Sequence, residues 1–213
     1  MYSKGLRIAA IAAAYVVSGI LCFFLPKVVG WSGRLVLGFF LPTMAVGICV
    51  LFRQLASSDP LRVNYARFRD TYELILNAVV IFIVGLHLTL LGTLLGGPSR
   101  WIGRVPSLLI GVLLVVVGCA LPRVRPNLAL GIRTPWTLHN EKVWAGTHRA
   151  GGYVLVAFGI VILTCTALAP QWLGKLVVFG AGAGVIALAA LSYWSWRLQL
   201  ELERRSSDSS QPR

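Results

Sequence analysis

Six long apolar runs constrain this chain more than any other feature. They occupy residues 8–25, 35–52, 74–95, 106–121, 151–169 and 173–194. A helix rises about 1.5 Å per residue, so runs of this length approach or match the roughly 30 Å of a bilayer's hydrocarbon core. Backbone groups inside a bilayer must bond within the protein, which favours helices. The sequence therefore predicts an all-α, polytopic membrane bundle with six transmembrane helices.

Composition excludes two other classes of protein. The chain is 57% hydrophobic and 13% charged, with a mean hydropathy of +0.77, far from the averages of soluble domains. Its formal charge of +13 would suit a nucleic-acid partner. However, the basic residues are scattered between apolar runs and form no continuous stripe, so we expect no direct nucleic-acid binding. The four cysteines fall in separate apolar runs without a Cys-x-x-Cys pair, which predicts neither disulfides nor a zinc site.

The distribution of positive charge predicts the orientation in the membrane. Fifteen of the twenty Lys and Arg residues lie in the N-terminal segment, in residues 53–73, in residues 122–150 and in the polar tail, residues 197–213. The three segments on the opposite side share the other five. By the positive-inside rule, both termini and the two long polar segments face the cytoplasm.

The 53–73 segment is basic and periodic. Leu61, Tyr65, Phe68 and Tyr72 recur at helical spacing, which predicts a basic amphipathic helix. Such a helix can dock a partner or anionic lipid, or it can be a solvated connector that carries positive charge for topology. Both interpretations stay open at this point.

The 122–150 segment is polar and aromatic, and it stands between two apolar runs. Pro126 and Pro135 interrupt any helix across its first half. After them, Thr137 or Asn140 can cap a helix, and Glu141 suits its first turn. The pattern predicts a turn followed by a short helix along the membrane surface, in front of the fifth span.

That short helix has two distinct sides. Val143, Trp144 and Thr147 fall on one side, and Arg149 points away from it. Trp144, with Trp136 before it, is the kind of residue that anchors a segment at the membrane interface.

The residue pattern of the segment also resembles that of a known family. Gly131-Ile-Arg-Thr-Pro-Trp-Thr-Leu138, then Asn140, Val143-Trp144 and Thr147-His148-Arg149, is similar to the signature loop of the SdpI-type bacterial membrane proteins. The resemblance is specific over residues 127–152, and residues 122–150 are called the signature loop below. Its candidate functional residues are Asn127, Gly131, Arg133, Thr134, Pro135, Trp136, Asn140, Trp144, Thr147, His148 and Arg149.

The resemblance implies a multi-pass protein of the bacterial plasma membrane that is not an enzyme and needs no cofactor. Its function would be resistance to a membrane-active peptide toxin or to envelope stress, with signalling to a cytoplasmic transcriptional repressor. The implied partners are membrane lipids, the peptide toxin and the repressor protein.

Within the signature loop, two arrangements are open. Arg133, Thr134, His148 and Arg149 can be displayed together beside the cytoplasmic mouth of the bundle, with the loop pinned at headgroup level by its tryptophans. In the other arrangement, the loop only packs against the ends of the fourth and fifth spans.

Two further functions follow from the histidines. His87 lies in the third span, where we expect a neutral ring bonded to the backbone or a hydroxyl of a neighbouring helix. The alternative places His87 in the path of a small transporter or channel.

An interfacial membrane enzyme using His139, Glu141 and His148 is less favoured, and the spacing of these residues does not indicate a metal site.

The C-terminal region is predicted to end outside the membrane. In the sixth span, Gly180, Gly182 and Gly184 would allow a neighbouring helix to approach closely. The tail from residue 197 is polar, and residues 206–213 are expected to be disordered.

Overall fold

The structure is a computed structural model that describes residues 4–26 and 30–210. The described elements are α1 (Lys4–Leu21), α2 (Trp31–Ser58), η1 (Arg62–Phe68), α3 (Arg69–Leu94), α4 (Arg100–Ala120), η2 (Leu121–Arg123), α5 (Pro135–His139), α6 (Glu141–Leu168), η3 (Pro170–Trp172) and α7 (Leu173–Ser210), where η marks a 3-10 helix. Within this part of the chain, six helices are long and apolar enough to cross a membrane. The predicted all-α membrane bundle is confirmed.

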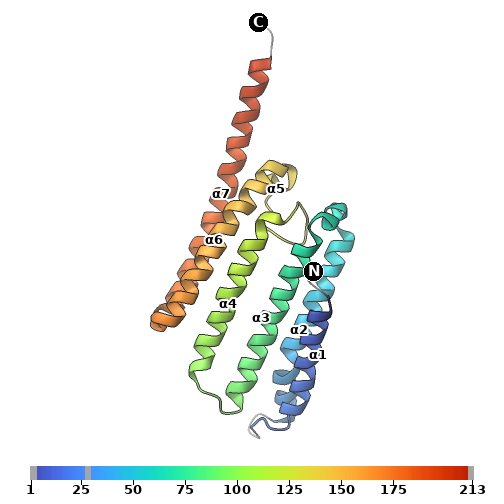
Figure 1. Cartoon of the computed structure of the whole chain (residues 1–213), viewed down its shortest axis with the longest axis vertical. Coiled ribbons are helices and arrows are strands. Elements are labelled where there is room, and N and C mark those ends of the chain that lie inside the picture. The colour runs from blue at the N-terminus through green and yellow to red at the C-terminus, as the bar shows by residue number, and fades with distance from the viewer. Residues whose placement is uncertain (1–3, 27–29, 211–213) are drawn as a thin grey trace.

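The helices form a row (Figure 1). Helices α6, α4 and α3 pack side by side, with α7 against α6 at one end and the α1–α2 pair against α3 at the other. Much of the outer surface is apolar; Leu168, Phe179 and Phe23, for example, are 70–80% exposed. Water would disfavour such a surface, whereas lipid chains accommodate it.

Helices α4 and α6 cross at two pairs of glycines. A Cβ atom built on Gly152 would lie 2.6 Å from the carbonyl oxygen of Gly118, and one on Gly159 would lie 2.7 Å from that of Gly111. Real Cβ atoms do not approach so closely, so this crossing requires glycine. The sequence pattern indicated close approach at Gly180, Gly182 and Gly184 instead. At Gly180 the prediction holds, because a Cβ atom there would overlap the ring of Phe158 on α6. Cβ atoms on Gly182 and Gly184 would meet nothing within 4 Å.

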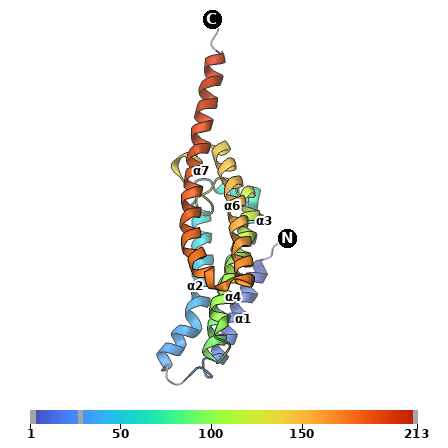
Figure 2. The ribbon, with the colours of Figure 1, turned by 90° about the vertical axis from the view of Figure 1, so that its left-hand side faces the viewer.

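Helices α2, α6 and α7 extend well beyond the apolar runs that predict them, and α6 and α7 change the description of the polar segments. Helix α6 begins at Glu141 rather than near residue 151, because Asn140 caps it and no proline interrupts it before Leu168. The predicted interfacial helix is thus the first turns of α6, and the separate short helix is α5. Helix α7 continues through the predicted polar tail to Ser210 (Figure 2), since residues 198–205 are mostly strong helix formers. Residues 211–213 lie outside the described residues.

The 53–73 segment is not one amphipathic helix. Helix α2 continues to Ser58, a 3-10 helix follows, and α3 begins at Arg69. The break has a local cause: the side chain of Asp59 accepts the backbone N–H of Leu61 at 2.7 Å, which competes with helical bonding, and Pro60 has no N–H to donate. The aromatic residues that define the predicted helix face do cluster, with the Tyr65 ring 5.3 Å from that of Phe68.

The 53–73 segment and the signature loop lie at the same end of the bundle (Figure 1). The turns after α1, α3 and α6 lie at the other end. This arrangement places the two long polar segments within reach of each other.

Candidate functional site

Asp59 joins the two polar segments. Its side chain is buried, and its Oδ2 atom accepts a hydrogen bond from the hydroxyl of Tyr65 at 2.8 Å and another from the backbone N–H of Leu128 at 2.7 Å. The Leu128 bond is a contact across 69 residues of sequence. Sequence reasoning did not select Asp59. The available signal was a rare acidic residue immediately before a proline.

Asn127 organises the turn that opens the signature loop. Its side chain is fully buried, and its Oδ1 atom accepts the backbone N–H groups of Ala129 and Leu130 at 2.8 and 2.6 Å. Its Nδ2 atom donates to the carbonyl oxygens of Arg125 and Leu130 at 2.7 and 3.1 Å. These four bonds are local, and the hydroxyl of Tyr65 adds a longer contact to Oδ1 at 3.4 Å. Asn127 therefore fixes the loop backbone and is not displayed on the surface.

Gly131 and His148 meet at the centre of the loop. Gly131 has a φ of +113°, and a Cβ atom there would lie 2.2 Å from Nε2 of His148. The same Nε2 atom accepts the backbone N–H of Ile132 at 3.1 Å, and Nδ1 bonds to the carbonyl oxygen of Trp144 at 2.9 Å. A backbone N–H can only donate and a carbonyl can only accept, so His148 is neutral and carries its hydrogen on Nδ1.

Trp144 and His148 are core residues of the loop. Their rings stack at 3.9 Å, and the indole Nε1 of Trp144 donates to the carbonyl oxygen of Val124 at 2.8 Å. Both side chains are almost completely buried, as are Val143 and Thr147. The predicted grouping of Val143, Trp144 and Thr147 on one side is confirmed. The expectations that Trp144 anchors the loop at the lipid interface and that His148 is displayed are wrong, because this side of α6 faces the protein.

His148 lies in the first turns of α6, which continues to Leu168. The three groups of the less favoured enzyme hypothesis are separated. His139 and Glu141 are exposed, whereas His148 is buried.

Helix α5 is fixed against α7 by a cap and a serine. Thr134 and Thr137 form a capping box around the first turn, with Pro135 at the first helical position. The hydroxyl of Ser192 on α7 lies 3.2 Å from that of Thr134 and accepts the indole N–H of Trp136 at 2.7 Å. Ser192 is fully buried and was missed, because a serine in an apolar run carries no distinctive signal.

Trp136 also packs on the aromatic residues of α7. Its ring stacks on that of Trp196 at 5.6 Å and meets the edge of Tyr193 at 5.9 Å. Trp136 therefore binds the loop to α7 in two ways, through the hydrogen bond of its indole nitrogen and through its ring contacts.

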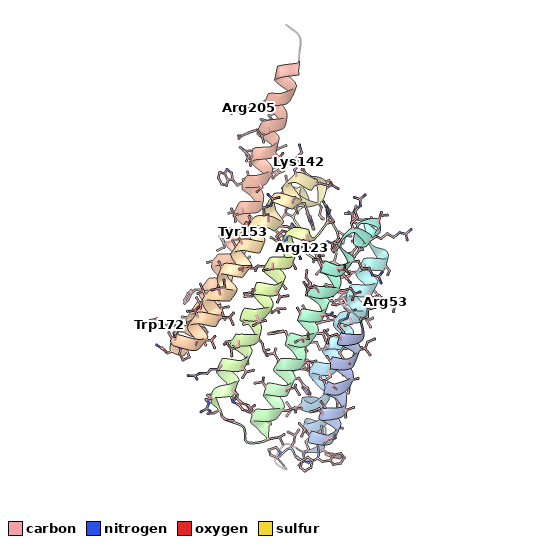
Figure 3. All side chains as sticks on the ribbon, in the orientation of Figure 1. Arg53, Arg123, Lys142, Tyr153, Trp172 and Arg205 are labelled. Atoms are coloured by element: carbon pink, nitrogen blue, oxygen red, sulfur yellow. The ribbon has the colours of Figure 1, made fainter. Side chains whose placement is uncertain are left out.

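The two arginines among the candidate functional residues reach the surface. Arg133 and Arg149 are exposed, and Nη1 of Arg133 donates to the carbonyl oxygen of Leu128. Pro135 is exposed too, and Thr134 is half-buried. Asn140 caps α6, because its Oδ1 atom accepts the backbone N–H groups of Lys142 and Val143 at 2.9 and 3.1 Å. Of the four side chains predicted to be displayed together, the structure exposes the two arginines. Figure 3 shows the neighbouring Arg123 and Lys142 at the same end of the bundle.

A buried ion pair lies outside the predicted site. Nη1 of Arg7 donates to Oε2 of Glu73 at 2.6 Å and to Oδ1 of Asn77 at 3.1 Å, and all three side chains are buried between α1 and α3. The sequence pattern placed Arg7 and Glu73 in loops, because the apolar runs begin after them.

His87 is fully buried in α3, and its Nε2 atom lies 2.6 Å from the hydroxyl of Ser18 on α1. Ser18 donates its hydrogen to the carbonyl oxygen of Ala14 at 2.6 Å. The hydroxyl oxygen is then the acceptor for His87, whose hydrogen is on Nε2. This is the kind of bond that we expected for a neutral intramembrane histidine.

The fold and the loop thus define a class, a polytopic helical membrane protein with a folded polar loop between its fourth and fifth spans. Residues 123–194 match the model of the SdpI/YfhL protein family. Over 53 residues the chain is 38% identical to the Immunity protein SdpI of Bacillus subtilis (strain 168). This match covers 25% of the chain and 26% of the relative, so the chain spans about a quarter of the curated relative it matches. No solved structure matches the chain.

Proposed function

We propose that this chain is an immunity-type membrane protein, which protects its cell against a membrane-active peptide toxin or envelope stress. The observation that carries the proposal is that the family match begins at the signature loop and that this loop is a fixed, internally bonded unit. The immunity function belongs to the curated relative by name. Its extension to this chain rests on the shared segment.

The construction of the signature loop favours a functional surface over a simple connector. Four sets of contacts fix the loop. Two connect it to other elements, through Asp59 and Ser192, and two are internal, at Asn127 and at the Gly131–His148 contact. A connector needs only length and solubility, whereas fixed exposed groups reduce the entropy cost of binding a partner. Arg133 and Arg149 are the exposed charges among the candidate functional residues of this scaffold. We propose that they contact the partner, a cytoplasmic repressor protein, through its carboxylates.

The proposal requires the loop to face the cytoplasm. The fifteen-to-five distribution of basic residues supports this orientation. Reporter fusions at residues 99 and 140 test it. We expect a periplasmic signal at residue 99 and a cytoplasmic signal at residue 140, and the same compartment at both positions would contradict the topology.

Toxin challenge of cells with and without this gene tests the function itself. We expect Arg133→Ala/Arg149→Ala to abolish protection without changing the membrane level or the thermal unfolding of the protein. Arg62→Ala/Arg67→Ala is the matched control, because it removes two exposed arginines from the same end of the bundle. Full protection by an abundant Arg133→Ala/Arg149→Ala variant would contradict the role of the loop.

Transport is the second candidate, and one observation favours it. The Arg7–Glu73 pair and Asn77 lie buried between two membrane-spanning helices, where ionisable groups commonly mark a substrate or ion path. Flux of protons or solutes into liposomes that contain the purified protein tests this function. Flux that Glu73→Gln abolishes would support it, and impermeable proteoliposomes would exclude it.

A further inference from the structure

A groove runs between α1, α2 and α3 beside the buried ion pair. Its volume is about 630 Å³, within the range of about 300–1,000 Å³ typical of small-molecule sites. Lys4, Arg7 and Arg53 line one part of it, and apolar side chains of α1 and α2 line the rest, among them Ile8, Val46 and Val50. Figure 3 shows Arg53 on α2 beside the first turns of α1.

The charge of the groove is unbalanced. Among the described residues that line it, Glu73 is the acidic one, and its carboxylate is paired with Arg7 at 2.6 Å. Lys4 and Arg53 are exposed, which leaves a formal excess of two positive charges. Arg7 adds donors as well, because both of its bonds to described residues leave from Nη1. A phosphate group satisfies such a cluster.

The groove is charged at the end of the bundle and apolar toward its middle, which is the order of head group and acyl chain in a lipid leaflet. Lys4 starts α1, and Arg53 lies in the last turns of α2, so the cations are at the end of the bundle where the polar segments are. From there, Ile8 on α1 and Val50 and Val46 on α2 lead toward the middle of the helices. An amphiphile would therefore place its charged head at the cation cluster and its chain along the apolar walls.

An extended peptide suits this groove less well. Its walls are helices, whose backbone N–H and C=O groups already bond to each other, so they offer few partners to the backbone of a second chain. A lipid chain needs no such partners. Basic pockets between spans on the cytoplasmic side commonly hold anionic lipid head groups.

We propose that this groove binds one phospholipid with an anionic head group, with its phosphate at Lys4, Arg7 and Arg53. The lipid fills the groove between α1, α2 and α3, and it covers the Arg7–Glu73 pair. This binding site is separate from the signature loop and does not depend on the immunity function.

Native mass spectrometry of the purified full chain tests the proposal, with phosphatidylglycerol and phosphatidylcholine of identical acyl chains as probes. We expect phosphatidylglycerol to bind about tenfold more tightly, as two uncompensated cations predict. Lys4→Gln/Arg53→Gln should remove this preference. Arg62→Gln/Arg67→Gln should retain it, because those arginines are exposed at the same end but lie outside the groove.

A second variant tests the position of the acyl chain. Val46→Trp fills the apolar part of the groove without changing the charge and should weaken the binding of both lipids. Retained preference in Lys4→Gln/Arg53→Gln would overturn the proposal, as would equal loss in both double variants or unchanged binding in Val46→Trp. Because these measurements use no toxin, they are independent of the toxin-challenge result.

Discussion

The backbone N–H of Leu128 donates a hydrogen bond to the carboxylate of Asp59 at 2.7 Å, and this bond connects the turn after α2 with the start of the signature loop. Asp59 is 2% exposed, so no water replaces it as the acceptor. One carboxylate therefore couples the N-terminal half of the bundle to the family-matched region, residues 123–194.

Replacing Asp59 should destabilise the whole protein. Asp59→Ala removes the acceptor of three hydrogen bonds and leaves the N–H of Leu128 unsatisfied. We expect a loss of about 3 kcal/mol in the free energy of unfolding, measured by titration with denaturing detergent in mixed micelles. Asp70→Ala is the control, because Asp70 is exposed in the first turn of α3 and should contribute below about 1 kcal/mol. Equal effects of the two substitutions would refute the coupling.

Gly131 should tolerate no side chain. Gly131→Ala places a Cβ atom against Nε2 of His148 and imposes an unfavourable φ on alanine, so we expect a loss of at least about 2 kcal/mol. Gly103→Ala, in open space on α4, should change stability little. In a His148→Ala background the steric part disappears, so Gly131→Ala should cost less there. Additive effects in this double-mutant cycle would mean that the two residues do not touch.

The two buried histidines should be opposite tautomers. The bonds of His148 to Ile132 and Trp144 require its hydrogen on Nδ1, whereas those of His87 to Ser18 require it on Nε2. Nitrogen-15 NMR of the histidine-labelled protein in micelles distinguishes the two forms. His148→Gln and His87→Gln assign the signals. The same tautomer for both rings would show that one of these hydrogen-bond networks is incorrect.

The α4–α6 crossing should be the packing contact most sensitive to size. Gly152→Ala forces the helices apart at a backbone-to-backbone contact, and we expect a loss of about 1–3 kcal/mol and a lower membrane level. Gly182→Ala adds the same methyl group to α7, where nothing lies within 4 Å, and should be nearly silent. Thermal unfolding of both variants in the same detergent makes the comparison. A larger effect at Gly182 would contradict the packing described for α4 and α6.

His87 should be structural if the protein is not a transporter. His87→Asn keeps a side chain that can bond to Ser18 but cannot titrate, so protection against toxin should survive. His87→Leu leaves Ser18 with one partner fewer and should lower the unfolding temperature. Loss of protection in a stable, abundant His87→Asn protein would instead support a proton path.

The sequence predicts the fold class because hydrophobic length is a local property. Each apolar run is read without knowledge of its neighbours, and the first turns of α6 could be placed because Asn140 and Glu141 form a local start signal. The helix ends were less predictable. Arg7 and Glu73 look like loop residues until α1 and α3 bring them to 2.6 Å, where each compensates the charge of the other.

The signature loop shows the same limit. The segment can be recognised from its residues, but the distribution between surface and interior depends on partners far away in the chain. His148 looks like a surface residue beside Arg149, yet it is buried because Gly131 leaves room for its ring. Asp59 and Ser192 were missed for the corresponding reason, since their hydrogen-bond partners lie 69 and 56 residues away.

The bonds from Thr134 and Trp136 to Ser192 have a consequence for biosynthesis. A chain emerges from the ribosome N-terminus first, so Asp59 and Leu128 can meet while α6 and α7 are still being made. Helix α5 has no fixed position until the ribosome has passed Ser192 and the last span has entered the membrane. Until then the loop is anchored on one side only, through Asp59. Its second anchor forms only once α7 is in place.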